Sequence, residues 1–270
     1  MGETVTSQPA PTLILPPKGE PLICFQDIYK SYNHQSVLRG VNLEVRCGET
    51  LVILGRSGAG KSVLTSMLVG LETPDAGSIT LAGVELTGLR TETDWDRLRL
   101  QMGYLFQGSA LYDFMTVGEN VAFPLVHHRR LTHDQIKQIV KEKLALVGLK
   151  DVESLEPSAL SGGMQRRVAL ARTLALDPHI IIYDEPTAGL DPITSDGIAH
   201  LIQDLQKSLD VTSILVTHDL RTARFVGDRL ALLYDGRIVF LGSTQELEDS
   251  DNPEVKSFLS PISLTESEGL

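Results

Sequence analysis

Residues 55–62, GRSGAGKS, carry the pattern of a phosphate-binding loop. They follow an apolar run at residues 51–54 and precede an apolar segment, which predicts a strand, a loop and a helix. Glycines let the chain wrap closely around a phosphate group, and the helix start presents backbone N–H groups to it. Lys61 adds a positive charge, and the hydroxyl of Ser62 suits Mg²⁺. This segment therefore predicts a site for the β- and γ-phosphates of a nucleotide.

Two carboxylates follow a second apolar run. Residues 180–183 are predicted to form a buried parallel strand, which ends at Asp184 and Glu185. Asp184 is placed to hold Mg²⁺ through its hydration shell, and Glu185 to polarise an attacking water as a general base. His218 follows a strand predicted at residues 213–217, where it would contact the terminal phosphate or orient that water. An acidic turn and a structural histidine are the ordinary alternatives, and the phosphate loop favours the catalytic interpretation.

Residues 160–167, LSGGMQRR, form a second anion-binding pattern. Ser161, Gly162 and Gly163 precede a helix predicted at residues 168–176, so backbone donors again gather at a helix start. One chain thus carries two phosphate-seeking helix starts that are well separated in sequence.

This arrangement resembles the nucleotide-binding domain of ABC transporters. The resemblance covers about residues 22–247 and depends on motifs in the family's order: Tyr32, the phosphate loop, Gln107, the 160–167 signature, Asp184 with Glu185, Asp191 and His218. It implies an α/β fold, with a RecA-like P-loop NTPase core, an antiparallel β subdomain and a helical subdomain that bears the signature.

The resemblance also implies ATP and Mg²⁺ as cofactors and a role for each matching position. Tyr32 would stack on adenine, although a tyrosine at a strand edge is the plain alternative. Gln107 would touch Mg²⁺ and the attacking water, and Asp191 would cross a dimer interface. The residues expected to bind ATP are Tyr32, Gly55, Arg56, Ser57, Gly58, Ala59, Gly60, Lys61, Ser62, Val63, Ser161, Gly162, Gly163 and Asp191. Those expected at Mg²⁺ are Ser62, Gln107 and Asp184, and those expected in catalysis are Glu185, His218 and Gln107.

Two residues depart from the family pattern. Met164 stands where many members have glutamine, and Arg56 replaces a common proline. The backbone donors of the signature do not depend on the Met164 side chain, and Arg56 lies outside the fixed residues of the loop, so ATP binding is still expected.

Further segments narrow the resemblance to the ATPases of phospholipid-handling Mla transporters. These are residues 106–111 (FQGSAL), 120–125 (NVAFPL), 161–164 (SGGM) with Arg166 and Arg167, and 191–194 (DPIT). The implied partners are a second copy of this chain in a head-to-tail ATP sandwich, an MlaE-like integral membrane permease and an MCE-domain substrate-binding protein. The implied location is the cytoplasmic face of the inner or plasma membrane, through the permease. An importer ATPase for amino acids or another small solute, and a soluble ABC-type assembly ATPase, stay open as alternatives.

Composition agrees with this interpretation. Lys and Arg number 24 against 35 Asp and Glu, a net charge of −11, which disfavours nucleic acid as a partner. The apolar runs are shorter than the ~20 residues that a membrane-spanning helix needs.

The alternation of predicted strands and helices favours a mostly parallel sheet with helices on both faces. We expect a disordered leader at residues 1–20, an ATP-binding domain at 21–245 with its helical subdomain at about 93–165, and an acidic tail at 246–270. This tail carries seven carboxylates and one lysine, and is a candidate for dimer or partner contacts. Within it, residues 252–259 are expected either to form a short packed helix or to belong to a flexible segment.

Overall fold

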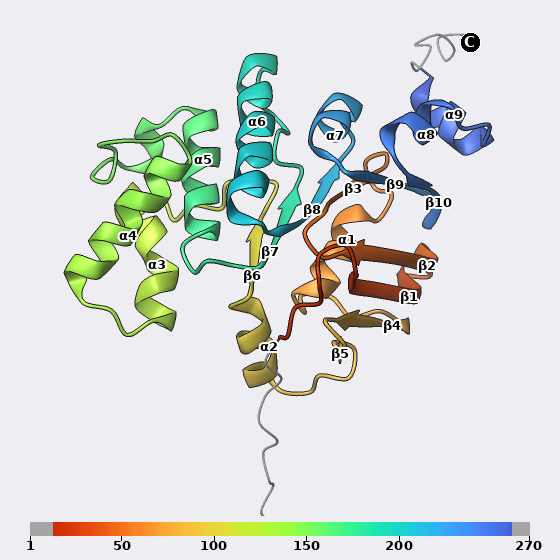
Figure 1. Cartoon of the computed structure of the whole chain (residues 1–270), viewed down its shortest axis with the longest axis horizontal. Helices are drawn as coiled ribbons and strands as arrows, with labels where there is room; N and C mark the ends of the chain where they lie inside the picture. Colours follow the sequence, from red (N-terminus) through yellow and green to blue (C-terminus); the bar gives the residue numbers. More distant parts are fainter. Residues whose placement is uncertain (1–12, 261–270) are drawn as a thin grey trace, which may run out of the picture.

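A computed structural model of the 270-residue chain describes residues 13–260. The described residues form a four-stranded and a six-stranded sheet with helices packed around them (Figure 1). The predicted leader and tail fall partly on residues 1–12 and 261–270, which lie outside the described residues. Within the described part of the leader, Leu13 and Leu15 pack against the core that the four-stranded sheet shares with α1 and the central strands.

The four-stranded sheet is antiparallel and has the order β2-β1-β4-β5. Its strands are β1 (Pro21–Tyr32), β2 (Gln35–Arg46), β4 (Ala76–Leu81) and β5 (Val84–Glu85). One face of β1 and β2 is buried because alternate residues are apolar, among them Ile23, Val41 and Val45. This sheet is the predicted antiparallel β subdomain.

The six-stranded sheet has the order β10-β9-β3-β8-β7-β6. Its strands are β3 (Thr50–Leu54), β6 (Met102–Leu105), β7 (Ile180–Asp184), β8 (Thr212–Thr217), β9 (Arg229–Tyr234) and β10 (Arg237–Gly242). All neighbouring pairs are parallel except β9 with β10. Every residue of β3, β7 and β8 is buried, as expected for parallel strands covered on both faces. Parallel pairing also places the carboxyl ends of these strands at one edge of the sheet.

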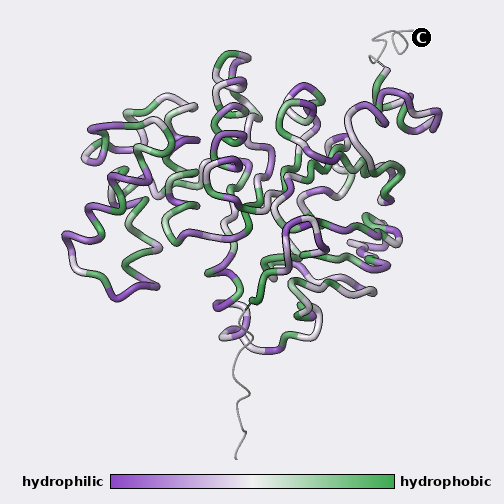
Figure 2. Tube along the Cα trace, in the orientation of Figure 1, coloured by the Kyte–Doolittle hydropathy of each residue, from purple (hydrophilic) through white to green (hydrophobic). Residues whose placement is uncertain are grey.

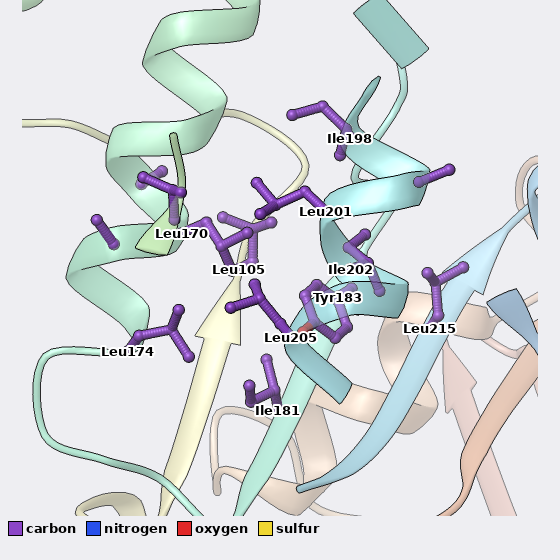
Figure 3. Close-up of a cluster of buried hydrophobic side chains, with 14 of the residues drawn as sticks. Leu105, Leu170, Leu174, Ile181, Tyr183, Ile198, Leu201, Ile202, Leu205 and Leu215 are labelled. Carbon is purple, nitrogen blue, oxygen red and sulfur yellow. The ribbon is translucent and has the colours of Figure 1, made fainter. Parts of the chain in front are cut away.

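Successive residues of each central strand point to opposite faces and so join two different cores. In β7, Ile181 and Tyr183 pack with α5 (Gly162–Thr173), α6 (Pro192–Leu209) and α7 (Leu220–Val226), as Figure 3 shows for α5 and α6. Ile180 and Ile182 instead join a core with α1 (Lys61–Leu68) and the antiparallel sheet. Hydrophobic residues accordingly gather along the central strands, while hydrophilic residues mark the outer helices (Figure 2). The α/β fold with a P-loop core is confirmed.

A helical region lies beside the β6 edge of the sheet (Figure 1). It contains α3 (Val117–His128), α4 (His133–Leu146), the short 3-10 helix η1 (Pro157–Ala159) and α5, while α2 (Glu92–Arg99) precedes β6. Capping boxes at Thr116 and Thr132 set the starts of α3 and α4. Among residues 13–260, no helix combines the length and the apolar composition of a membrane span.

The signature helix differs from its predicted bounds. We expected a helix at residues 168–176, whereas α5 starts at Gly162 with Ser161 as its N-cap. The side chain of Ser161 accepts a hydrogen bond from the Met164 backbone N–H, which satisfies a donor of the first turn. The prediction was wrong because glycine disfavours helix interiors but is tolerated in a first turn.

The C-terminal segment packs against β9 and β10 of the six-stranded sheet. Helix α8 (Thr244–Glu248) runs across the boundary predicted at residue 245, and α9 (Pro253–Leu259) follows it. Val255 is fully buried, and Phe258 and Leu259 pack against the same core. Of the two alternatives for residues 252–259, the structure shows the packed helix.

Candidate functional site

The phosphate loop connects β3 to α1, and its backbone requires glycine. Gly58 and Gly60 have φ angles of +80° and +99°, which other residues rarely adopt. At Gly55, a Cβ atom would lie 2.6 Å from the Leu233 carbonyl oxygen of β9, so only glycine allows this approach. Ala59 and Val63 pack against the core beneath the loop, while Arg56, Ser57 and Gly58 are exposed. The loop therefore has a fixed base and an open upper side.

Lys61 lies inside the curve of this loop. The residue is 6% exposed, and its Nζ donates to the carbonyls of Gly55 at 2.8 Å and Arg56 at 3.1 Å. The same Nζ lies 3.4 Å from Oε1 of Glu185. The loop carbonyls and this carboxylate thus fix the ammonium group where a phosphate would meet it.

Ser62 and Asp184 meet directly, although 122 positions separate them in sequence. Ser62 Oγ donates to Asp184 Oδ1 at 2.9 Å. On the other side, the Tyr104 hydroxyl donates to Asp184 Oδ2 at 3.3 Å. Burial raises the pKa of Asp184, and these two hydrogen bonds oppose that shift. Oxygen atoms of a hydroxyl and a carboxylate thus converge, which is the donor set that Mg²⁺ prefers.

Tyr104 is a site residue that the sequence analysis missed. It lies on β6 opposite Ile182 of β7, and burial raises the pKa of its phenol to about 12. In the sequence, the one feature that marked Tyr104 was its hydroxyl group within an otherwise apolar strand. The pairing of β6 with β7 was needed to place this hydroxyl beside Asp184.

Glu185 follows β7 in a backbone conformation that is uncommon outside glycine, with φ of +47°. Its backbone N–H donates to the Val216 carbonyl of β8 at 2.9 Å, which holds it in that conformation. The side chain is buried, and both carboxylate oxygens lie 3.0–3.1 Å from Nδ1 of His218. Since an ionised carboxylate can only accept, the Nδ1–H of His218 donates in this contact. One end of the sheet thus brings together Lys61, Ser62, Asp184, Glu185 and His218.

Two other expected site residues lie apart from this cluster. Gln107 is exposed two positions after β6, at the same end of the sheet. Tyr32 ends β1, is 38% exposed, and has the Lys30 ammonium 5.1 Å from its ring centroid. Strand β2, which follows Tyr32, lies against the phosphate loop. A Cβ atom on Gly60 would be only 2.9 Å from Cδ2 of Leu38 in this strand.

The signature residues form a separate, exposed helix start. Ser161 and Gly162 are exposed, whereas Gly163 is buried against α6, where an added Cβ would lie 2.4 Å from Thr194 Cγ2. Asp191 caps α6 beside it, accepting from the backbone N–H groups of Ile193 and Thr194 at 3.1 and 3.0 Å. The hydrogen bond from the Thr194 hydroxyl, together with these backbone bonds, lowers the pKa of Asp191. The two predicted anion-binding helix starts, at α1 and α5, lie in different parts of the molecule (Figure 1).

The family comparison agrees with this geometry. A family model described as "ABC transporter" matches residues 38–188, more than half of the chain. The chain belongs to the ABC transporter family. It is the ATP-binding and ATP-hydrolysing subunit of such a transporter.

Relatives in this family carry names with different cargoes. The chain is 40% identical over 242 residues to a probable ribonucleotide transport ATP-binding protein, mkl, of Mycobacterium tuberculosis, covering 88% of this chain and 67% of the relative. It is 39% identical to the intermembrane phospholipid transport system ATP-binding protein MlaF of Haemophilus influenzae, covering 81% and 83%. It is also 38% identical to the methionine import ATP-binding protein MetN of Rhizobium johnstonii, covering 89% and 66%. The relatives thus agree on an ABC ATPase and differ in cargo.

A solved ABC cassette shares the fold. The dimeric, post-hydrolysis ATP-binding cassette MJ0796, bound to ADP and Pi, superposes with a TM-score of 0.76 at 31% identity. The superposition covers 82% of this chain and 98% of the cassette. This likeness to a cassette with hydrolysis products supports ATP hydrolysis by this chain.

Proposed function

We propose that this chain drives phospholipid movement between membranes, coupling ATP-driven dimerisation to a separate permease. The observation that supports an ATP-driven function is a cluster of side chains at one end of the six-stranded sheet. It is formed by Lys61, Ser62, Asp184, Glu185 and His218. The cargo is proposed from the likeness to MlaF and from the segments FQGSAL, NVAFPL and DPIT.

The phosphate loop, residues 55–63, would hold the β- and γ-phosphates of ATP. Its backbone N–H groups and the start of α1 supply donors, and Lys61 supplies a charge within the curve of the loop. Tyr32 would stack on the adenine ring. Ser62 and Asp184 would hold Mg²⁺, together with Gln107, and a bound Mg²⁺ would neutralise charge on the phosphates.

Glu185 would act as the general base toward the attacking water. The Nδ1–H of His218 orients the carboxylate, and the Lys61 ammonium lies 3.4 Å from it, so the side chain is held at the edge where the terminal phosphate would lie. Gln107 would help to place the water from the β6 side. Catalysis here depends on positioning and electrostatics, as is general for phosphoryl transfer.

A second copy of the chain would complete each ATP site. Ser161 and Gly162 are exposed at the start of α5, apart from the phosphate loop of their own chain. In a head-to-tail dimer they would meet the γ-phosphate held by the partner, with Gly163 supporting the helix and Asp191 at the interface. ATP would then bind the closed dimer better than the open one, and such a difference in affinity is what shifts a conformational equilibrium.

A permease would dock on the helical region, which we propose as a subdomain at about residues 93–165. A cavity of about 480 Å³ lies beside it. Its lining includes Phe106 and Tyr112 from the loop after β6, Phe123 of α3, and the polar residues Arg172 and Thr173 at the end of α5. Phe114, nearby in sequence, is 81% exposed. Such an exposed apolar surface is typical of a partner site. This contact would hold the chain at the cytoplasmic face of the membrane, with an MlaE-like permease and an MCE-domain protein as the other components.

Purification of the full-length chain from its native membranes in mild detergent tests the proposal. We expect a multispanning permease and an MCE-domain protein to copurify, with phospholipid in the same sample. The relative MetN supports a second candidate, a methionine importer. Copurification of an importer-type permease, with ATPase activity that methionine stimulates and phospholipid does not, would overturn the lipid proposal.

A further inference from the structure

The loop that carries Gln107 is tied to the signature helix at two points. Arg166 Nη1 donates to the Phe106 carbonyl at 2.9 Å, and Arg172 Nη2 donates to the Ser109 carbonyl at 3.2 Å. Both arginines belong to α5, which begins at the Ser161 cap. Only Gln107 and Gly108 lie between the two tied residues, and both are exposed.

Arg166 is an unusual residue to find in this position. It is 4% exposed, and its Nε has no hydrogen-bond partner among the described residues. Burial lowers the pKa of the guanidinium, and no carboxylate in the described part of the chain opposes that shift. Its second contact, from Nη2 to the Ala188 carbonyl at 3.4 Å, reaches the loop that leads to Asp191. A buried arginine without a carboxylate is costly, so its two carbonyl contacts call for a reason beyond packing.

Arg172 holds the far end of the same loop. Its guanidinium lies 5.6 Å from the ring centroid of Tyr112, and its Nη1 contacts Asn120 Oδ1 at 3.5 Å. Asn120 is fully buried and fixes the next part of the chain, donating to the carbonyls of Tyr112, Met115 and Thr116. The backbone on both sides of Gln107 and Gly108 is therefore immobilised, while these two residues project.

We propose that Arg166 and Arg172 are positioning residues that make the loop bearing Gln107 move together with the helix that begins at Ser161. This proposal rests on the role proposed above for Gln107 in hydrolysis. A displacement of the loop would be passed to the helix that presents Ser161 and Gly162 to the partner's ATP. The Ala188 contact of Arg166 would extend the same coupling to the loop of Asp191.

Lysine replacements test the geometry while keeping the charge. The planar guanidinium has several N–H donors and can bond two separate carbonyl groups. The single ammonium group of lysine is more compact and would not hold both carbonyl groups in place. Arg166→Lys and Arg172→Lys should each lower kcat for ATP by about tenfold with little change in KM, since misplacement affects the chemical step. The matched control is Arg167→Lys, because Arg167 Nη1 donates to the Val147 carbonyl at 2.7 Å, within the helical region. It should keep kcat, while its Tm falls as much as those of the other two.

A double-mutant cycle with Gln107→Ala distinguishes positioning from general destabilisation. If the arginines act through Gln107, adding Arg172→Lys or Arg166→Lys to Gln107→Ala should lower kcat no further. Additive losses, or an equal loss of kcat in Arg167→Lys, would overturn the proposal. A Gln107→Ala protein with unchanged kcat would instead refute the role of Gln107 itself, and with it this coupling. Because Arg172 is only partly buried, its variant keeps the test valid if Arg166→Lys does not fold.

Discussion

The two glycine-rich helix starts of this chain differ in what surrounds them. At the phosphate loop, Ser62 contacts Asp184 at the end of β7, and Lys61 contacts Glu185, which follows it. At the start of α5, Ser161 caps its own helix, and Gly163 packs against Thr194. No carboxylate is hydrogen-bonded to Ser161 among the described residues. Similar sequence patterns therefore give one helix start with carboxylates in contact and one exposed helix start without them.

The difference suits the proposed dimer, in which the exposed start of α5 would supply one part of an ATP site and the partner's phosphate loop the other. In the function we propose, Lys61 at the α1 end would bind phosphate and Glu185 beside it would activate water, so this end would need only further stabilisation of negative charge. The α5 end offers backbone donors and a dipole, which stabilise an anion supplied from elsewhere. Changes at the first region should therefore alter catalysis and ATP affinity, and changes at the second should alter stability and dimer formation.

The largest expected effect is at Glu185. Glu185→Gln should lower ATP hydrolysis by about 10²–10⁴-fold, because a positioned general base contributes that much. ATP affinity should be retained, so the variant should accumulate as a closed dimer on size-exclusion chromatography with ATP. Normal turnover in this variant would exclude Glu185 as the base.

The next effect is on binding at the phosphate loop. Lys61→Ala should weaken ATP binding by about 10–100-fold, because a hydrogen bond to a charged group contributes about 1.5–3 kcal/mol. Equilibrium titration with a fluorescent ATP analogue measures this loss. An unchanged titration curve would show that the ammonium inside the loop does not contact phosphate.

Gly163→Ala tests the packing side of the second region. The new Cβ would overlap Thr194, whose hydroxyl is held 2.5 Å from Asp191 Oδ2, so the side chain cannot turn away freely. We expect a loss of about 1–2 kcal/mol in the free energy of unfolding, measured by denaturant titration. Gly162→Ala is the control, since its Cβ would meet Leu190 at an ordinary 3.5 Å. Equal losses in both variants would contradict the packing argument.

The smallest expected effect is a change in stability that distinguishes Ser161 at the start of α5 from Ser62 at the start of α1. Ser161→Ala should lower the free energy of unfolding by about 1 kcal/mol, because the N-cap of α5 is lost. Ser62→Ala should reduce Mg²⁺-dependent hydrolysis, because its hydroxyl belongs to the Asp184 contact. Thermal unfolding and ATPase assays on both proteins check this contrast. A stability loss confined to Ser62→Ala would reverse the comparison.

Local patterns predicted most of the elements and the class of chemistry. The buried runs at β3 and β7 and the helix after Lys61 follow from apolar periodicity and flanking glycines. The errors lie at boundaries such as the start of α5. There the cap formed by Ser161 sets the first residue of the helix, and the pattern of hydrophobic residues does not. Strand β10 was not predicted, because a short, partly exposed edge strand has a weak pattern.

The sequence by itself determined the phosphate loop, the acid pair and membership in the ABC family, because these depend on residue types at fixed local spacing. Only the tertiary structure decided which distant groups meet. The contacts of Ser62 with Asp184, Tyr104 with Asp184, and Arg166 with Phe106 depend on strand order and helix packing. Such contacts leave no periodic trace along the chain, because each arises where two separately formed elements come together in the fold.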